Sequence, residues 1–217
     1  MTIPHAELKA RQRAERAGWP DFVSTRIHRA LSWLRRAEDC SDDDGRFVFL
    51  WIAFNAAYAN ELGEHRMPEN RRFGEFLDRL VALDESGRLR RLLWEQFAGP
   101  VRVLLQNKFV FQPYWDHLNG LPSSDDWAGQ FERANRAATG ALMKHDTGKV
   151  LGVVFARLYT LRNQLMHGGA TWNSSVNRDQ LRDANAIMGA LVPIVIEIMM
   201  DSAGEHWGEP CYPVREG

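Results

Sequence analysis

Apolar residues recur at helical spacing along most of this chain, and almost no window alternates between apolar and polar residues. A strand with one buried face needs a period of two, whereas a buried helix face needs apolar residues every three or four positions. The pattern therefore predicts an all-α fold, an antiparallel helical bundle with long helices. The expected helices start at Asp21 and then span residues 46–60, 71–83, 86–97, 126–145, 147–167 and 177–202.

Polar residues mark where several of these helices should begin. Asp21 follows Pro20 and is placed to cap the first helix. The acidic run 42–44 precedes the helix at 46–60, where carboxylates favour the positive end of the helix dipole. Asn177, with Gln180 three residues later, resembles a capping box for the last helix.

Turn-forming residues predict where the helices are interrupted. Gly99 and Pro100 break the helical pattern. Residues 108–126 combine aromatic and turn-forming residues, which predicts an irregular packed insertion with short helical turns. Residues 168–175 should form a loop, and Pro193 should kink the last helix because its ring clashes with the preceding turn.

Length and composition predict a single soluble domain over residues 1–217, of which 45% are hydrophobic and 25% charged. We expect its core at about 21–202 and a short C-terminal tail at 203–217. Cys40 and Cys211 lie far apart and match no metal-ligand spacing, so we expect a reducing, cytoplasmic setting.

No segment predicts a secretory signal or a membrane span. The polar N-terminus lacks an apolar signal region. The most apolar stretch, 187–200, contains Glu197 and falls short of the roughly 20 residues that cross a membrane. We expect this stretch to form a buried helix, and we expect no membrane partner.

The overall charge excludes a uniformly basic surface for nucleic acid, because 27 Lys and Arg face 28 Asp and Glu. The charge is nevertheless uneven: residues 1–36 hold eight Lys or Arg and three acidic residues. This excess fits either a solvated helix face or a basic approach surface for RNA.

Three polar side chains stand at the end of the apolar helix expected at 147–167. Arg162 is a fork-shaped donor suited to phosphate oxygens. His167 can move a proton near neutral pH, and Asn163 can hold a phosphate or orient the imidazole. Two glycines follow and let the backbone turn. The residue types suit phosphodiester chemistry, while capping of the helix C-terminus by Arg162 and His167 explains them equally well.

Helix geometry constrains how these side chains can meet. Asn163 and His167 are about 40° apart around a helix, whereas Arg162 and His167 are about 140° apart. Fraying at His167, curling of Arg162 or a second protomer would each resolve this separation. The face that carries Asn163 and His167 begins with small residues, which permit close approach of another helix and predict a homodimer. This face comprises Gly152, Ala156, Tyr159, Asn163 and His167.

Tyr159 and Asn55 are the candidate substrate-binding residues. Tyr159 lies on the same face as Asn163. Asn55 lies one turn after Trp51 on the otherwise apolar helix at 46–60, where a buried amide needs hydrogen-bond partners. Asn55 either makes a structural hydrogen bond to a neighbouring helix or loop, or supports the motif residues from behind.

Three segments in order resemble the HEPN superfamily, in particular its Apea-like bacterial members. Residues 162–167 (RNQLMH) resemble the family's Arg–polar–spacer–His signature near the end of a long helix. Residues 49–58 (FLWIAFNAAY) resemble an early helix of the Apea-like members. Residues 167–173 (HGGATWN) resemble the segment that follows their signature. The resemblance covers about residues 21–202.

The resemblance implies a metal-independent endoribonuclease without a cofactor, acting as a toxin or antiphage effector. Arg162 would hold the scissile phosphate, His167 would act as general acid or base for 2′-hydroxyl attack, and Asn163 would position one of them. The implied assembly is a homodimer with the motif helices facing each other. The implied partners are RNA and a cognate antitoxin or nucleotidyltransferase. A non-catalytic nucleotide- or RNA-binding module and a helical interaction protein are the alternatives.

Overall fold

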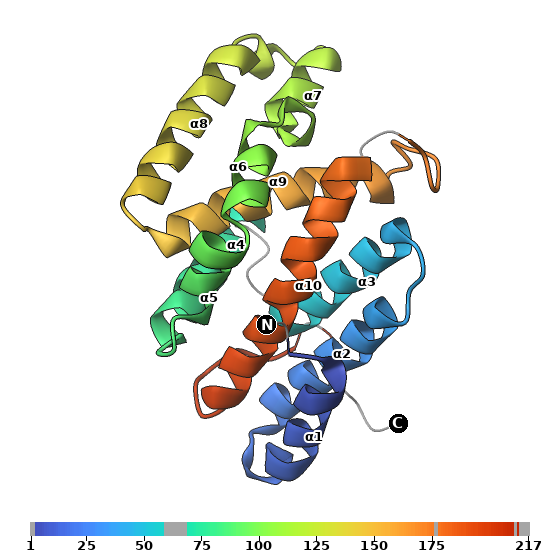
Figure 1. Cartoon of the computed structure of the whole chain (residues 1–217), viewed down its shortest axis with the longest axis vertical. Helices are drawn as coiled ribbons and strands as arrows, with labels where there is room; N and C mark the ends of the chain where they lie inside the picture. Colours follow the sequence, from blue (N-terminus) through green and yellow to red (C-terminus); the bar gives the residue numbers. More distant parts are fainter. Residues whose placement is uncertain (1–2, 59–68, 176–177, 211, 213–217) are drawn as a thin grey trace.

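The computed structural model describes residues 3–58, 69–175, 178–210 and 212, and within these it is all-α, with no β-strand (Figure 1). The predicted fold class is confirmed. The α-helices are α1 His5–Glu15, α2 Asp21–Glu38, α3 Asp43–Tyr58, α4 Glu69–Leu83, α5 Arg88–Arg91, α6 Ala98–Gln106, α7 Gln112–Leu118, α8 Trp127–Met143, α9 Thr147–Met166 and α10 Arg178–Asp201. Shorter helical segments are η1 Arg16–Gly18, the π-helical η3 Leu92–Gln96, η4 Lys108–Val110 and η5 Pro122–Ser124.

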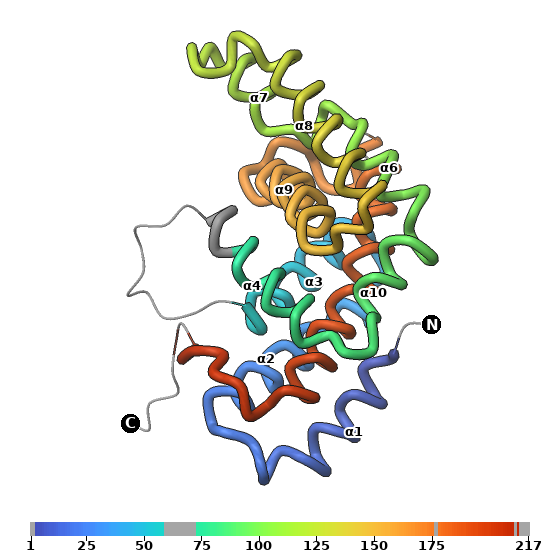
Figure 2. Tube along the Cα trace, turned by 90° about the vertical axis from the view of Figure 1, so that its left-hand side faces the viewer, coloured from blue at the N-terminus to red at the C-terminus, as the bar shows by residue number. Residues whose placement is uncertain are grey.

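Helix α9 crosses the molecule between two groups of helices (Figure 1). On one side, α2, α3 and α10 pack against one another and α1 packs on α2 and α10. On the other side, α6, α7 and α8 form a lobe, and α6 and α8 contact α9 directly. Figure 2 shows α9 nearly end-on, with α7 and α8 above it and α1 and α2 at the opposite end. The motif helix is therefore supported by both groups.

Helix α10 supplies much of the core because it is apolar on most of its surface. Among the described helices it alone is long and apolar enough to cross a membrane, and 72% of its most apolar window is buried inside the protein. Its bounds agree with the helix expected at 177–202, so its length, unlike that of the stretch 187–200 alone, is sufficient to cross a membrane. Such burial is typical of a helix at the centre of a protein core. The helix continues through Pro193 without interruption.

An aromatic cluster joins α3, α4 and α9. The ring centroids of Phe54 and Phe155 are 4.5 Å apart, and those of Tyr58 and Phe73 are 4.6 Å apart. The Trp51 ring contacts both Phe155 and Tyr159 at slightly more than 6 Å. Offset and edge-on aromatic pairs at these distances add specificity to the burial of their apolar surface. The aromatic side chains of α3 and α4 thus fix the position of α9.

Several helix boundaries differ from those the sequence predicts. Pro20 occupies the N-cap of α2 without a side-chain bond, and Asp21 is the first helical residue rather than the cap. Gly99 and Pro100 lie in the first turn of α6, since proline is tolerated where backbone N–H groups lack helical partners. The helix expected at 86–97 is divided into α5 and the π-helical η3. The proposed cap at Asn177 lies outside the described residues.

Other boundaries agree with the sequence. The Asp42 carboxylate accepts a hydrogen bond from the Gly45 backbone N–H at 2.8 Å, so the acidic run does start α3. The insertion at 108–126 consists of η4, α7 and η5 joined by turns, as expected. Helix α1 was not predicted, because its only buried side chains are Leu8 and Gln12.

Two arginines are buried in opposite circumstances. Arg26 on α2 is 0% exposed and donates to the backbone carbonyls of Ala57, Gly208 and Glu209 at 2.7–3.1 Å. Arg157 on α9 is 3% exposed and, among the residues that the structure describes, has a single long hydrogen bond, 3.4 Å to the Leu105 carbonyl, while its Nε has no partner there. Burial lowers the pKa of the Arg157 guanidinium to about 10. The Arg157 charge stacks instead on Phe111, 4.3 Å from the ring centroid.

We expect these arginines to affect stability in opposite directions when each is replaced by methionine. Arg157→Met should raise the free energy of unfolding by about 1 kcal/mol, because it removes a poorly paired buried charge. Arg26→Met should lower it by about 3 kcal/mol, because backbone carbonyls lose their donors. Urea unfolding at neutral pH measures both. A loss of stability in Arg157→Met as large as that in Arg26→Met would contradict this account.

Candidate functional site

Helix α9 presents the predicted motif at its C-terminal end. The helix starts where Asp146 accepts a hydrogen bond from the Lys149 backbone N–H at 3.1 Å. Its inner face is buried in the core, as predicted, although Leu165 near the end is only half-buried. The buried residues of that face are Val150, Val154, Leu158 and Leu161. Met166 is the last helical residue and His167 occupies the C-cap.

The structure brings Arg162, Asn163 and Tyr159 together. Arg162 Nη1 donates to Asn163 Oδ1 at 2.9 Å, and the guanidinium carbon lies 5.8 Å from the centroid of the Tyr159 ring. The Arg162 side chain therefore curls round α9 towards the face that carries Asn163. Curling of Arg162 is one of the three ways suggested above to reduce its angular separation from His167. Its Nε is buried and has no hydrogen-bond partner.

His167 is exposed at the end of the helix, one turn beyond Asn163. Its backbone N–H donates to the Asn163 carbonyl at 3.0 Å, and the chain then turns at Gly168, whose φ of 70° favours glycine. Within the described residues, no hydrogen bond joins the His167 imidazole to Arg162 or Asn163. The backbone thus places His167 on the same face of α9 as Asn163, and the exposed imidazole is accessible to a ligand.

Asn55 is not brought into this group by any described hydrogen bond. It lies on α3, whose Trp51 ring contacts Tyr159 at 6.1 Å. The Asn55 side chain is half-buried rather than buried, which removes the need for a buried partner. Its role in substrate binding stays a prediction without structural support.

The loop after His167 is fastened to the start of α3. Arg178 donates to both carboxylate oxygens of Asp44, at 2.6 and 2.7 Å, and the Asn173 backbone N–H donates to Asp44 Oδ2 at 3.3 Å. The Trp172 indole donates to Asp42 Oδ1 at 3.3 Å, although its side chain is 74% exposed. We call these contacts the Asp44 clasp. The acidic run was expected only to start a helix, and its attachment of this loop is a second role that the sequence did not indicate.

The face of α9 proposed for dimer formation is open. Ala156 is exposed, and a Cβ added at Gly152 would meet nothing within 4 Å. Packing within the described part of the chain therefore does not require small residues at these two positions. Close approach of another helix remains sterically permitted on this face.

The basic excess of residues 1–36 lies on α1 and α2, of which α1 is at the end of the molecule away from the loop that follows α9, whereas α2 runs towards the start of α3 (Figure 1). Part of it is unavailable, because Arg26 is buried and Arg11 pairs with Glu15 and Asp201 at 2.9 and 2.8 Å. For Arg11 and Arg26, this arrangement favours a structural use of the charge over direct approach of RNA to the motif.

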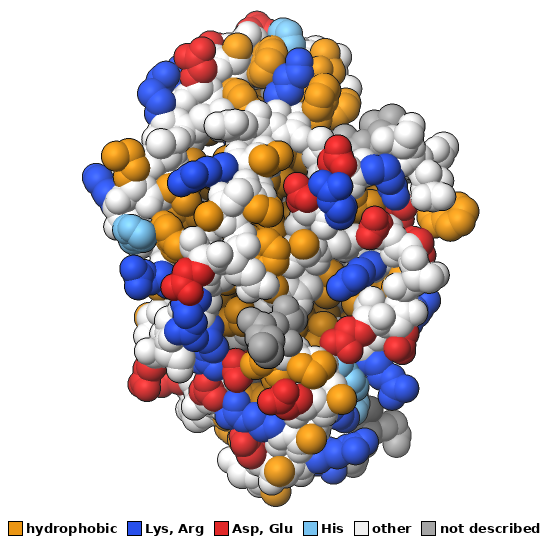
Figure 3. Space-filling view, in the orientation of Figure 1, with side chains coloured by type: hydrophobic (Ala, Val, Ile, Leu, Met, Phe, Trp, Pro, Cys, Tyr) orange, Lys and Arg blue, Asp and Glu red, His pale blue; other side chains and the backbone are white. Residues whose placement is uncertain are grey.

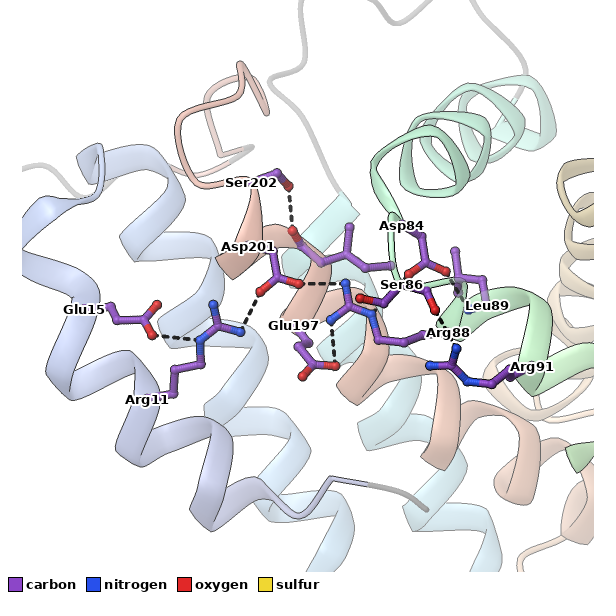
Figure 4. Close-up of polar contacts among 11 residues, drawn as sticks. Arg11, Glu15, Asp84, Ser86, Arg88, Leu89, Arg91, Glu197, Asp201 and Ser202 are labelled. Atoms are coloured by element: carbon purple, nitrogen blue, oxygen red, sulfur yellow. Dashed lines mark hydrogen bonds and ion pairs between the residues drawn. The ribbon is translucent and has the colours of Figure 1, made fainter.

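A hollow of about 400 Å³ lies between α5 and the end of α10. Arg88 in its wall contacts Asp84, Glu197 and Asp201 at 2.6–3.1 Å, and Asp201 also binds Arg11 (Figure 4). Burial opposes the Arg88 charge, but these hydrogen bonds outweigh it and raise the pKa of Arg88. Three carboxylates already neutralise the Arg88 charge. The network is therefore better explained as a set of ion pairs that hold α1, α5 and α10 together than as a ligand-binding site.

No protein-family model, curated protein or solved structure matches this chain. In the described part of the chain, no group of three or more His, Cys, Asp or Glu side chains is arranged to hold a metal ion. The candidate site therefore rests on the geometry of α9 and on the resemblance of its motif.

The Asp44 clasp predicts a pH-dependent contribution to stability. The hydrogen bonds from Arg178 hold the pKa of Asp44 below its ordinary value of 3.8. Its carboxylate therefore stabilises the fold fully above pH 3.8, and this contribution is lost as pH falls through the lowered pKa. Asp44→Asn should reduce the free energy of unfolding at pH 7 by about 2 kcal/mol.

Urea unfolding of both proteins across a pH series tests the clasp. The difference between wild type and Asp44→Asn should shrink as pH drops below 3.8. The exposed Asp179→Asn serves as the control and should change stability little. A difference that stays constant down to the most acidic pH would exclude this ionic contribution.

Proposed function

We propose that this protein is a metal-independent endoribonuclease of the HEPN type. The observation that carries the proposal is the Arg162 guanidinium, held by Asn163 and Tyr159 on the helix whose C-cap is the exposed His167. A guanidinium with a fixed orientation suits a phosphodiester, and an exposed imidazole suits proton transfer near neutral pH. The resemblance of residues 162–167 to the HEPN signature supports the same chemistry.

In this mechanism the RNA supplies its own nucleophile. His167 removes the proton from a 2′-hydroxyl, whose oxygen attacks the adjacent phosphorus while Arg162 binds the phosphate oxygens. The bond to the 5′-oxygen breaks, and that oxygen takes up a proton. The products are a 2′,3′-cyclic phosphate and a 5′-hydroxyl. In a homodimer, the His167 of each protomer would be available as the acid or the base.

The main alternative is a non-catalytic RNA- or nucleotide-binding module that uses the same residues. The observation in its favour is that no described hydrogen bond orients the His167 imidazole. A general base is commonly held by a second group, so this freedom fits ligand binding as well as catalysis.

Replacement of the motif residues should abolish cleavage without unfolding the protein. His167→Ala should slow cleavage of total RNA or tRNA by about 10²–10⁴-fold, which is the usual effect of a positioned acid or base. Arg162→Lys should also be slow, because lysine keeps the charge but not the planar fork. Gel assays of RNA cleavage, with circular dichroism as the folding control, measure both effects.

Two further conditions test the mechanism itself. Excess EDTA should not change the rate, and a substrate with a 2′-deoxy sugar at the cleavage position should be inert because it lacks the nucleophile. Cleavage of the deoxy substrate, or activity lost in EDTA and restored by magnesium, would overturn the mechanism. RNA binding that needs Arg162 but never leads to cleavage would favour the binding module.

We expect a homodimer that uses the open face of α9. Ala156→Glu places a charge on that exposed face and should convert the dimer into a monomer while leaving the fold intact. Ala137→Glu, at an exposed alanine on α8, is the matched control and should remain dimeric. Light scattering at micromolar concentration measures the mass. A monomeric wild type would contradict the composite site.

A further inference from the structure

Aromatic side chains gather on the lobe beside the end of α9. Phe109 in η4 is 40% exposed, and its ring meets that of Tyr114 edge-on, with centroids 5.7 Å apart. Tyr114 in turn contacts the Trp115 ring at 5.5 Å. Together with Lys108, we call these residues the aromatic platform. An exposed ring with edge-on neighbours is held in place while one of its faces remains accessible.

Lys108 gives the aromatic platform a positive charge. Its Nζ lies 5.3 Å from the centroid of Phe109 and 5.2 Å from that of Tyr114, within the range of cation–π interactions. Within the described residues Lys108 forms no ion pair, and the neighbouring Asp116 carboxylate accepts a hydrogen bond from Gln112. Figure 3 shows hydrophobic and basic side chains close together at this end of the molecule, over α7 and α8.

One carbonyl connects the aromatic platform to the motif helix. The Phe109 carbonyl accepts hydrogen bonds from the Trp115 indole at 2.8 Å and from Gln164 Nε2 on α9 at 2.6 Å. Gln164 is the residue after Asn163, and His167 follows three positions later. Viewed along the helix axis, His167 lies between Asn163 and Gln164, which are about 100° apart. The aromatic platform therefore adjoins the side of the motif that carries His167, opposite Tyr159.

We propose that the aromatic platform binds unpaired nucleotides of single-stranded RNA next to the Arg162–His167 motif. This inference rests on the proposed function and adds the class of substrate. The exposed Phe109 ring stacks on a nucleobase, since every base presents a π-face, and Lys108 pairs with a neighbouring phosphate. A duplex keeps its bases inside, so the platform selects unpaired RNA. A purely apolar protein contact would gain nothing from the unpaired ammonium group of Lys108.

Fluorescence anisotropy with a labelled, unstructured RNA tests this inference in the full-length His167→Ala protein, in which cleavage is suppressed. Adding Phe109→Ala should weaken binding about tenfold, the effect of losing one stacked base. Adding Lys108→Ala should weaken binding at low salt, and this effect should diminish as salt is raised. Val103→Ala and Lys149→Ala, at exposed positions outside the platform, are the matched controls and should bind as the parent does.

The outcomes separate this inference from the proposed function. Platform-dependent RNA binding, combined with a wild type that cleaves nothing, supports the platform and overturns the nuclease. Normal cleavage and binding in Phe109→Ala overturns the platform alone. Duplex RNA that binds as tightly as single-stranded RNA also overturns it. The platform is also overturned if Phe109→Ala leaves RNA binding unchanged but lowers the mass measured by light scattering. The aromatic platform would then be a protein interface.

Discussion

The aromatic cluster between α3, α4 and α9 is the contact on which the placement of the candidate site depends. Trp51, Phe54 and Phe155 lie at its centre and remain almost wholly buried. Because closely packed rings tolerate little displacement, they fix both the position and the rotation of α9. Tyr159 belongs to this cluster and also meets the Arg162 guanidinium. Tyr159 thus connects the aromatic core directly to the Arg162 side chain of the motif.

Beyond Leu161, α9 leaves the core and its last turn is supported from two sides. The Asp44 clasp holds the loop that follows His167, and Gln164 holds the lobe through the Phe109 carbonyl. Both supports use hydrogen bonds that are directional, in contrast to the apolar contacts deeper in the protein. The side chains between them are exposed or half-buried, so a fixed backbone presents accessible functional groups. This combination suits recognition of an extended polymer.

Periodicity was sufficient to predict α2, α3 and α9, because each buries one apolar stripe. It could not reveal α1, where Leu8 is the only buried apolar residue and where ion pairs from Arg11 supply part of the attachment. The sequence also indicated that Arg162 and His167 point in different directions. Only the structure shows that Arg162 curls towards Asn163, since rotamer choice depends on neighbours that are distant in sequence. The clasp was missed for the same reason: Asp44 and Arg178 are 134 positions apart.

Arg26 has a consequence for the order in which the chain can assemble. Its guanidinium lies in the interior on α2, yet two of its acceptors are the carbonyls of Gly208 and Glu209, which follow it by 182 and 183 positions. Until those residues have been synthesised, α2 and α3 can pair, but the Arg26 guanidinium lacks two of its backbone acceptors. Complete packing around Arg26 must therefore wait for residues 208 and 209. A chain that stops before residue 208 would bury this charge with fewer acceptors, which favours opening of the core and degradation by quality-control proteases.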